Sequence, residues 1–345
     1  MNVDIAPLAS ADDARIRAVI DARLKPPGAL GRLEELAFSL VRILGCHQTE
    51  LVSPTMLLFA GDHGVAAEGV SVVDAEVTRL MVERFLKGDA SINVFCRQAQ
   101  MALRVIDCGI LRAPVSHPAL ISHRLGAGTA PFHRASAMSK IRVLDGMENG
   151  RTVVQSLKRA GSNLIALGEM GIGNTTSASA LMAALTGLPP KQCIGSGSGI
   201  TPATLARKRD IIQRALQRHA RSFHDITATL AALGGFEIVT MTGAVLAAAE
   251  LGMAVLVDGF IATVAALCAC RYAPAAREYL IFAQCGSEQG HRPLLAHMDA
   301  EALLDLGLRM GEGAGAALAL PLLRSALAFY HEMASLEDAG IELPR

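Results

Sequence analysis

Short apolar runs alternate with longer helical patterns through most of the chain. Five of the runs read as strands, and each is followed by a glycine-containing turn and a helical stretch; they span residues 55–60, 102–107, 164–167, 253–257 and 279–282. Strands that alternate with helices in this way are typical of a parallel sheet covered on both faces. The pattern therefore predicts an α/β fold, with any ligand at the carboxyl ends of the strands.

The two ends of the chain have a different pattern. Residues 1–50 and about 300–345 look helical, without the strand signal of the central region. A chain of 345 residues exceeds the size at which a single core usually stops growing. We therefore expect a large α/β domain over residues 51–300, which holds the ligand site, and a small helical domain built from residues 1–50 and 301–345.

Composition and charge narrow the class of partner. The chain is 51% hydrophobic with only 4% aromatic residues, and its 32 Lys and Arg balance its 32 Asp and Glu. No basic run carries interleaved aromatic residues. Nucleic-acid binding needs a basic footprint or a stacking surface, so neither composition nor charge favours it. The expected partner is a small molecule.

The cysteines and the hydropathy of the chain indicate in which cellular compartment the protein is expected. The seven cysteines contain no Cys-x-x-Cys pair, and Cys268 and Cys270 have no second ligand pair nearby, so they read as buried thiols and no metal is expected. The apolar stretch 253–270 is interrupted by Asp258 and Gly259, which favours a buried strand running into a helix over a membrane span. The N-terminus lacks a signal-peptide pattern, so we expect a reduced cytoplasmic protein.

The strongest catalytic candidate is Glu312. It lies in an apolar stretch between Gly311 and Gly313, with Gly315 two residues further on. Glycines let the backbone approach a ligand closely, and a site with little water raises the pKa of a carboxyl group and makes it a better base. The alternative is a helix-capping turn with an exposed glutamate. In the predicted domain division, the small helical domain contributes Glu312.

A second candidate site is the turn 167–177, which follows a predicted strand and leads to a helix expected from Ala178. Its hydrogen-bond donors are the backbone of Gly171 and Gly173 and the side chains of Asn174, Thr175 and Ser177. Such donors at a helix N-terminus favour a phosphate. The turn matches neither the nucleoside triphosphate nor the dinucleotide glycine fingerprint, so a simple capped helix is the alternative.

A second glycine cluster, residues 195–199, is followed by a basic helix with the triplet 207–209. A loop of this type can wrap a ribose and phosphate while Lys208 supplies a positive charge. Taken alone, the cluster would read as a flexible loop and the triplet as a solvated helix face.

Motifs spread along almost the whole chain resemble one enzyme family. The matching segments, in order, are 25–36, Ala60-Gly-Asp-His-Gly-Val65, 92–95, Gly168-Glu-Met-Gly-Ile-Gly-Asn-Thr-Thr-Ser177, 234–237, 241–243, 257–260, 290–291 and 306–313. They resemble the nicotinate-nucleotide dimethylbenzimidazole phosphoribosyltransferases, which make the α-ribotide of the lower ligand of cobalamin. The resemblance implies a Rossmann-like parallel sheet covered by helices, a smaller helical domain, a homodimer, and no cofactor or metal.

The resemblance also implies roles for individual residues. It makes Glu312 the general base and places nicotinate mononucleotide against Glu169, Gly171, Gly197 and Lys208. The full set predicted to bind the substrates is Ser71, Val73, Asp74, Ala75, Glu169, Gly171, Gly173, Asn174, Thr175, Gly197, Ser198, Lys208, Ser287, Met310, Gly311 and Gly313.

The implied reaction moves the 5-phosphoribosyl group of nicotinate mononucleotide to 5,6-dimethylbenzimidazole or a related base and releases nicotinate. The pyridinium of the nucleotide is already a cationic leaving group, so the reaction needs neither an acid nor magnesium. The remaining task is to take a proton from the azole while its other nitrogen attacks C1′ from the α face.

The sequence departs from the family pattern where the acceptor base is expected to bind. The family usually has an aromatic residue, proline and glutamine where this chain has Val73, Asp74 and Ala75, and the usual His-Arg-Ser-Ala-Glu-Pro-Gly-His is replaced over residues 284–291. Other departures are Ser196 for arginine and Ala314 for threonine. The altered run motivates a different aromatic acceptor, such as a purine or phenol. A non-catalytic partner subunit of a heteromer is a further alternative, which the retention of Glu312 disfavours.

Overall fold

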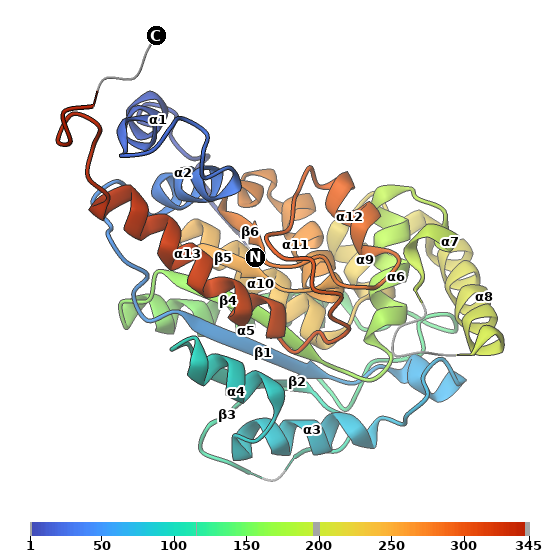
Figure 1. Ribbon diagram of the computed structural model, residues 1–345. Coiled ribbons are helices and arrows are strands. Elements are labelled where there is room, and N and C mark those ends of the chain that lie inside the picture. The colour runs from blue at the N-terminus through green and yellow to red at the C-terminus, as the bar shows by residue number, and fades with distance from the viewer. Residues whose placement is uncertain (1, 115, 196–200, 342–345) are drawn as a thin grey trace.

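The computed structural model describes residues 2–114, 116–195 and 201–341. Its core is one six-stranded sheet with the order β3-β2-β1-β4-β5-β6, and every neighbouring pair is parallel (Figure 1). The strands are β1 Thr55–Gly61, β2 Ala102–Gly109, β3 Leu120–Ser122, β4 Leu164–Met170, β5 Ala254–Val257 and β6 Leu280–Phe282. This order is that of the doubly wound Rossmann fold, which confirms the predicted fold class.

The helices connect and cover these strands. They are α1 Asp13–Ala22, α2 Arg32–Leu44, α3 Glu76–Lys87, α4 Ser91–Gln98, α5 Lys140–Arg159, α6 Asn174–Thr186, α7 Pro190–Cys193, α8 Pro202–His219, α9 Ile226–Leu233, α10 Phe236–Glu250, α11 Phe260–Tyr272, α12 His291–His297 and α13 Ala314–Glu332. Three short 3-10 helices, Gly64–Glu68, Ala220–Ser222 and Pro274–Tyr279, complete the regular structure of the described residues.

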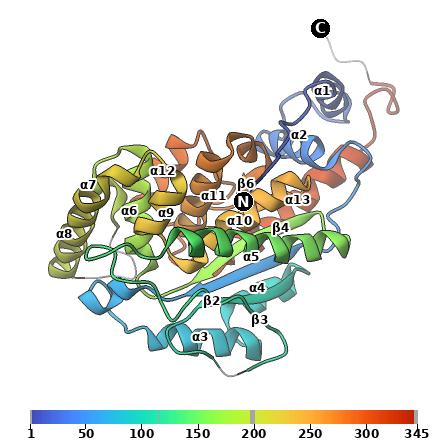
Figure 2. The same cartoon turned by 180° about the vertical axis from the view of Figure 1, so that it is seen from behind.

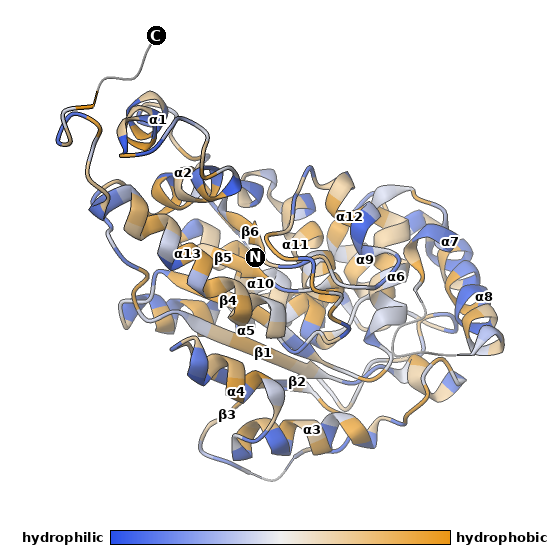
Figure 3. Cartoon of the chain, viewed as in Figure 1, coloured by the Kyte–Doolittle hydropathy of each residue, from blue (hydrophilic) through white to orange (hydrophobic). Residues whose placement is uncertain are grey.

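All five predicted strands are present, and the structure adds β3. The strands β1 and β5 are buried along their whole length, which explains their continuous apolar sequence. In Figure 3 the central strands are coloured as hydrophobic, whereas α8 at the edge carries hydrophilic residues. The missed strand β3 has three residues and is only partly buried at the sheet edge, so it gives no buried apolar run.

Helices cover both faces of the sheet. Helices α4 and α13 lie on the face seen in Figure 1, and α5 crosses the opposite face, seen in Figure 2. Helix α5 packs closely on α10 because glycines lie at the crossing. A Cβ on Gly150 would lie 2.1 Å from the carbonyl oxygen of Thr240, and one on Gly243 would lie 2.0 Å from that of Met147. Any larger residue at these positions would force the helices apart.

The two ends of the chain are in contact through α2 and α13, and Arg23 forms an isolated bridge with Ser335. Helix α13 also packs against α4 and β4 of the central layers. The expectation of helix from about residue 300 is wrong up to Gly313, because residues 303–311 run as an extended segment tied to main-chain groups of β4 and of the chain after β6. The division into two domains stays a prediction.

The apolar stretch at 253–270 forms β5 and the first part of α11, which confirms the predicted strand and helix. Within the residues that the structure describes, no helix is long and apolar enough to cross a membrane. The seven cysteines are free thiols.

Candidate active site

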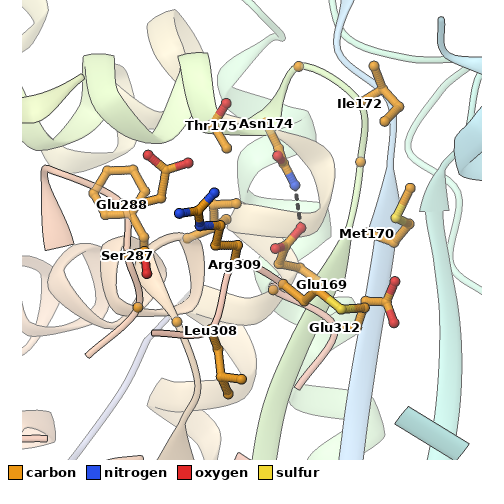
Figure 4. Close-up of a pocket in the computed structure, with 18 of the residues that line it drawn as sticks. Glu169, Met170, Ile172, Asn174, Thr175, Ser287, Glu288, Leu308, Arg309 and Glu312 are labelled. Atoms are coloured by element: carbon orange, nitrogen blue, oxygen red, sulfur yellow. Dashed lines mark hydrogen bonds between the residues drawn. The ribbon is translucent and has the colours of Figure 1, made fainter. Parts of the chain in front are cut away.

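The carboxyl ends of β4, β5 and β6 open onto one cavity, which segment 308–312 closes on one side (Figure 4). Its volume is about 270 Å³. The cavity therefore lies where ligands bind in open α/β sheets, beyond the carboxyl ends of the strands.

Most of the predicted site residues line this cavity. They are Ser71, Glu169, Gly171, Gly173, Asn174, Thr175, Lys208, Ser287, Met310, Gly311 and Glu312. Four others, Val73, Asp74, Ala75 and Gly313, are not among the lining residues. Gly197 and Ser198 lie outside the described residues. The structure thus brings together the turn after β4, the basic helix and the glycine-flanked glutamate, which are far apart in the sequence.

Glu312 is held against the end of β4. The carbonyl of Gly311 accepts a hydrogen bond from the Glu169 N–H at 2.9 Å. A Cβ on Gly168 would lie 2.6 Å from the Glu312 carbonyl oxygen, so glycine is required in the strand for this approach. The glutamate is only 8% exposed, and its Oε2 accepts a hydrogen bond from Ser91 Oγ at 3.0 Å. The alternative of an exposed capping glutamate is therefore wrong.

Burial raises the pKa of Glu312 above that of an ordinary glutamate, and the hydrogen bond from Ser91 partly offsets this rise. A carboxylate with a raised pKa is a stronger base than one in water. The arrangement therefore offers a carboxyl group of raised pKa at the wall of the cavity.

The glycines that follow Glu312 lie close to protein groups, and the predicted contact of Gly313 with a substrate stays a prediction. Asp258, directly after β5, is fully buried and accepts hydrogen bonds from the N–H groups of Gly313 (3.2 Å) and Ala316 (2.9 Å). A Cβ on Gly315 would lie 2.4 Å from Gln284 Cγ and 2.8 Å from Asp258 Oδ1, and one on Gly313 would lie 2.5 Å from Met56 Sδ. Glycine at 315 therefore lets Gln284 and Asp258 lie against the start of α13, and the hydrogen bonds to Asp258 fix the main chain beside Glu312. Burial raises the pKa of Asp258 to about 7.

A second carboxyl group faces the cavity from β4. Glu169 is 5% exposed and accepts a hydrogen bond from the side-chain amide of Asn174, as Figure 4 shows. Burial raises its pKa well above the usual value, and the neighbouring carboxylates of Glu237 and Asp258 raise it further. The protonated form of Glu169 is therefore favoured relative to an ordinary glutamate, and in that form it can donate as well as accept a hydrogen bond.

The predicted phosphate turn and the basic helix meet at Lys208. Its side chain is 1% exposed, and Nζ donates a hydrogen bond to Thr175 Oγ1 at 2.9 Å, whereas Arg207 and Arg209 are exposed. Burial lowers the pKa of Lys208 to about 8, and the nearby Glu288 opposes this shift. A lysine and a threonine hydroxyl at a helix N-terminus can together bind an anion.

The start of that helix differs from the prediction. Helix α6 begins at Asn174, four residues before the expected Ala178, because Gly173 at φ +95° turns the chain directly into it. Thr175 consequently belongs to the first helical turn, next to Lys208, rather than to a preceding loop.

Only the first residue of the run 71–75 lines the cavity. Ser71 lines it, but Val73 is 42% exposed, and Asp74 Oδ1 accepts the Glu76 N–H at 2.8 Å at the start of α3. Asp74 thus has a local structural partner. The predicted contacts of Val73, Asp74 and Ala75 with a substrate stay predictions.

Several cavity residues were not identified from the sequence. Arg309 and Glu288 are the most polar of them, and in Figure 4 their charged groups lie on the side of the cavity where Thr175 is found. Phe260, Ile261 and Gln284 add an apolar wall and an amide. Arg309 belongs to the same motif as Glu312, and Glu288 belongs to the altered segment 284–291. These two motifs were the sequence features from which both residues could have been identified.

The fold and the cavity together define a class: a Rossmann-type α/β protein with an anion site at a helix N-terminus and a desolvated carboxylate in the same pocket. Comparison with known proteins specifies this class further. A family model described as phosphoribosyltransferase matches residues 5–341.

Named relatives and a solved structure agree with that match. The chain is 53% identical over 340 residues to the nicotinate-nucleotide–dimethylbenzimidazole phosphoribosyltransferase of Shewanella loihica, covering 99% of both chains. It is 54% identical over 338 residues to the enzyme of the same name from Shewanella amazonensis, covering 98% of both. The crystal structure of CobT from Thermus thermophilus superposes with a TM-score of 0.92 at 40% identity, over 96% of this chain and 99% of that one. The chain therefore belongs to the nicotinate-nucleotide–dimethylbenzimidazole phosphoribosyltransferase family, as its motifs predicted.

Proposed function

We propose that this enzyme transfers the 5-phosphoribosyl group of nicotinate mononucleotide to 5,6-dimethylbenzimidazole or a related base, with inversion to the α-ribotide. The relatives named above share one enzyme name. They therefore do not favour the two alternatives drawn from the sequence, a purine or phenol acceptor and a non-catalytic subunit. The observation that carries the proposal is the pairing, in one cavity, of a desolvated carboxylate at Glu312 with an anion site at Lys208 and Thr175.

In the proposed reaction the nucleotide phosphate binds at Lys208, Thr175 and the N-terminus of α6. The bond between C1′ and the pyridinium nitrogen breaks, and its electron pair returns to the ring, so nicotinate leaves with a neutral ring nitrogen. An azole nitrogen of the acceptor forms the new bond to C1′ from the opposite face. The proton on the other azole nitrogen passes to Glu312, whose carboxylate also stabilises positive charge at C1′.

The remaining cavity residues are assigned to substrate binding. We assign the nucleotide to Glu169, the turn from Gly171 to Thr175, Ser287 and the glycine loop with Gly197 and Ser198, and the acceptor to Ser71 and Met310. Because Glu169 shares the cavity with Glu312, its buried carboxyl group would ionise more readily beside a cationic pyridinium.

The pH dependence of nucleotide capture follows from Lys208. Its pKa is lowered to about 8, so the side chain is positive below that pH and loses its charge above it. We expect kcat/KM for nicotinate mononucleotide, which reports the free enzyme, to fall above about pH 8. Bound phosphate stabilises the charged form of Lys208, so kcat should stay constant to a higher pH than kcat/KM does. Steady-state kinetics from about pH 6 to 10 test this, and a flat kcat/KM across that range would place the phosphate away from Lys208.

Competition between acceptors tests the proposed substrate pair. Val73 and Ala75 replace an aromatic and a glutamine, a combined loss of about 1 to 3 kcal/mol for a base that used both. Nicotinate mononucleotide is offered with equimolar 5,6-dimethylbenzimidazole, benzimidazole, adenine and a phenol, and each ribotide is quantified. We expect dimethylbenzimidazole to react with reduced preference over benzimidazole. Overwhelming conversion of dimethylbenzimidazole would show that these substitutions leave specificity intact, and conversion of adenine or the phenol alone would replace the proposed acceptor.

We further propose that the protein is a homodimer in a reducing, cytoplasmic compartment. The free thiols support the compartment. Val72, Val73, Leu80 and Leu111 have exposed apolar side chains, which supports their burial against a second copy. Light scattering after size-exclusion chromatography measures the assembly directly.

A further inference from the structure

Ser91 is the side chain that holds the carboxylate of Glu312. Its hydroxyl donates to Glu312 Oε2 at 3.0 Å, and in the described part of the chain no other side chain makes a hydrogen bond to that carboxylate. The two residues are 221 positions apart, and Ser91 is partly buried. The contact therefore depends on how α4 and the segment before α13 are placed by the fold.

Helix α4 is a rigid support for this hydroxyl. Ser91 is its first residue, and Asn93 ties the turn together: its Oδ1 accepts the Ala90 N–H at 3.2 Å, and its Nδ2 donates to the Phe85 carbonyl at 2.9 Å. Ile92 is fully buried, and α4 packs against α13, which begins two residues after Glu312. The hydroxyl and the main chain of Glu312 are thus held by the same pair of packed helices.

We propose that Ser91 is a positioning residue for the reaction: by holding Oε2 of Glu312, it leaves Oε1 as the oxygen that faces the acceptor and takes its proton. The inference rests on the proposed function. A carboxylate with one oxygen fixed loses rotational freedom before the substrate arrives, which favours the productive arrangement.

The same hydrogen bond also controls the protonation of the base. Burial raises the pKa of Glu312 and the Ser91 hydroxyl lowers it, so loss of the hydroxyl should raise that pKa further. The other charged or titratable groups that face this segment or share its cavity are Glu169, Asp258, Lys208, Glu288 and Arg309. None of them is changed by substitution at Ser91.

The test compares Ser91→Ala with Ser91→Thr, which keeps the hydroxyl, and with Val94→Ala, a control at a half-exposed position of the same helix. A base works when ionised, so a raised pKa moves the acid limb of the kcat profile to higher pH. For Ser91→Ala we expect a shift of about one pH unit and a loss of kcat of about tenfold at low pH, with a smaller loss at high pH. The nucleotide KM should be unchanged, Ser91→Thr should retain most of the activity, and Val94→Ala should match the parent protein.

The pKa of Glu312 is also measured without turnover, by carbon-13 NMR of labelled glutamate carboxyl groups, with Glu312→Gln to assign the signal. A rise in this pKa for Ser91→Ala, restored by Ser91→Thr, supports the inference even for a protein that shows no transfer, whereas absence of transfer by the parent protein contradicts the proposed function alone. A pKa of Glu312 and a kcat profile that are both unchanged by Ser91→Ala would overturn the role of Ser91.

Discussion

Glu312→Gln is expected to lower kcat by about two to four orders of magnitude, the usual contribution of a general base. The amide has almost the same shape and can still accept the hydrogen bond from Ser91, but it cannot take the proton from the azole. Nucleotide binding should persist, because the anion site at Lys208 and Thr175 is formed by other elements. Stopped assays of ribotide formation give kcat, and calorimetry gives the Kd for nicotinate mononucleotide.

The matched control is Glu332→Gln, which removes an exposed carboxylate at the far end of α13. It should behave as the parent protein in both measurements. If Glu312→Gln kept more than half of the activity near neutral pH, Glu312 would not be the base.

Lys208→Ala is expected to raise the nucleotide KM by about one to two orders of magnitude. The loss of a charge-assisted contact to phosphate costs about 1.5 to 3 kcal/mol. The effect on kcat should be smaller, since the proposed mechanism has Lys208 hold the phosphate together with its partner Thr175 and gives it no role at the bond that breaks. Initial rates over a range of nucleotide concentrations at low salt measure both parameters.

Arg209→Ala is the control, because this arginine is exposed on the same helix one residue away. Its nucleotide KM should stay within about twofold of the parent value, since surface charges are strongly screened. Lys208 is buried, so thermal unfolding of both variants is recorded to confirm that the fold survives. An unchanged KM for a folded Lys208→Ala protein would place the phosphate elsewhere in the cavity.

The sheet could be predicted because its signal is local. A buried parallel strand is a continuous apolar run, and β1 and β5 have this pattern over every residue. The edge strand β3 is short and partly exposed, so its sequence does not differ from that of a loop. The extended path of residues 303–311 could not be predicted either, since its hydrogen bonds go to distant parts of the chain.

The candidate site was predictable where one segment carries several chemical groups. Glu312 between glycines and most of the donors after β4 were recognised in this way, and these line the cavity. The predicted donor Ser177 is instead buried and donates a hydrogen bond to the Leu233 carbonyl. The contacts that prepare these groups were not recognised, because Asp258 lies 55 residues from Gly313 and Ser91 lies 221 residues from Glu312. Gly315 is a further example: the groups that it accommodates, Gln284 and Asp258, are adjacent to it only in the folded chain.

The basic triplet 207–209 shows what a sequence pattern leaves undecided. The three residues look equivalent along the chain, yet the structure buries Lys208 and exposes its two neighbours. Successive helical residues point about 100° apart, so only one of three can face the core. Which one faces it depends on where α8 meets α6, a tertiary contact.

The central claim, transfer of a phosphoribosyl group at this cavity, is tested most directly by following both products in one NMR experiment. The parent protein is incubated with nicotinate mononucleotide and 5,6-dimethylbenzimidazole, and nicotinate and ribotide are quantified together with the anomeric configuration at C1′. We predict equal amounts of the two products, the α anomer only, and no nicotinate without an acceptor. Release of nicotinate in the absence of any base, a β product, or no reaction with any acceptor would contradict the account.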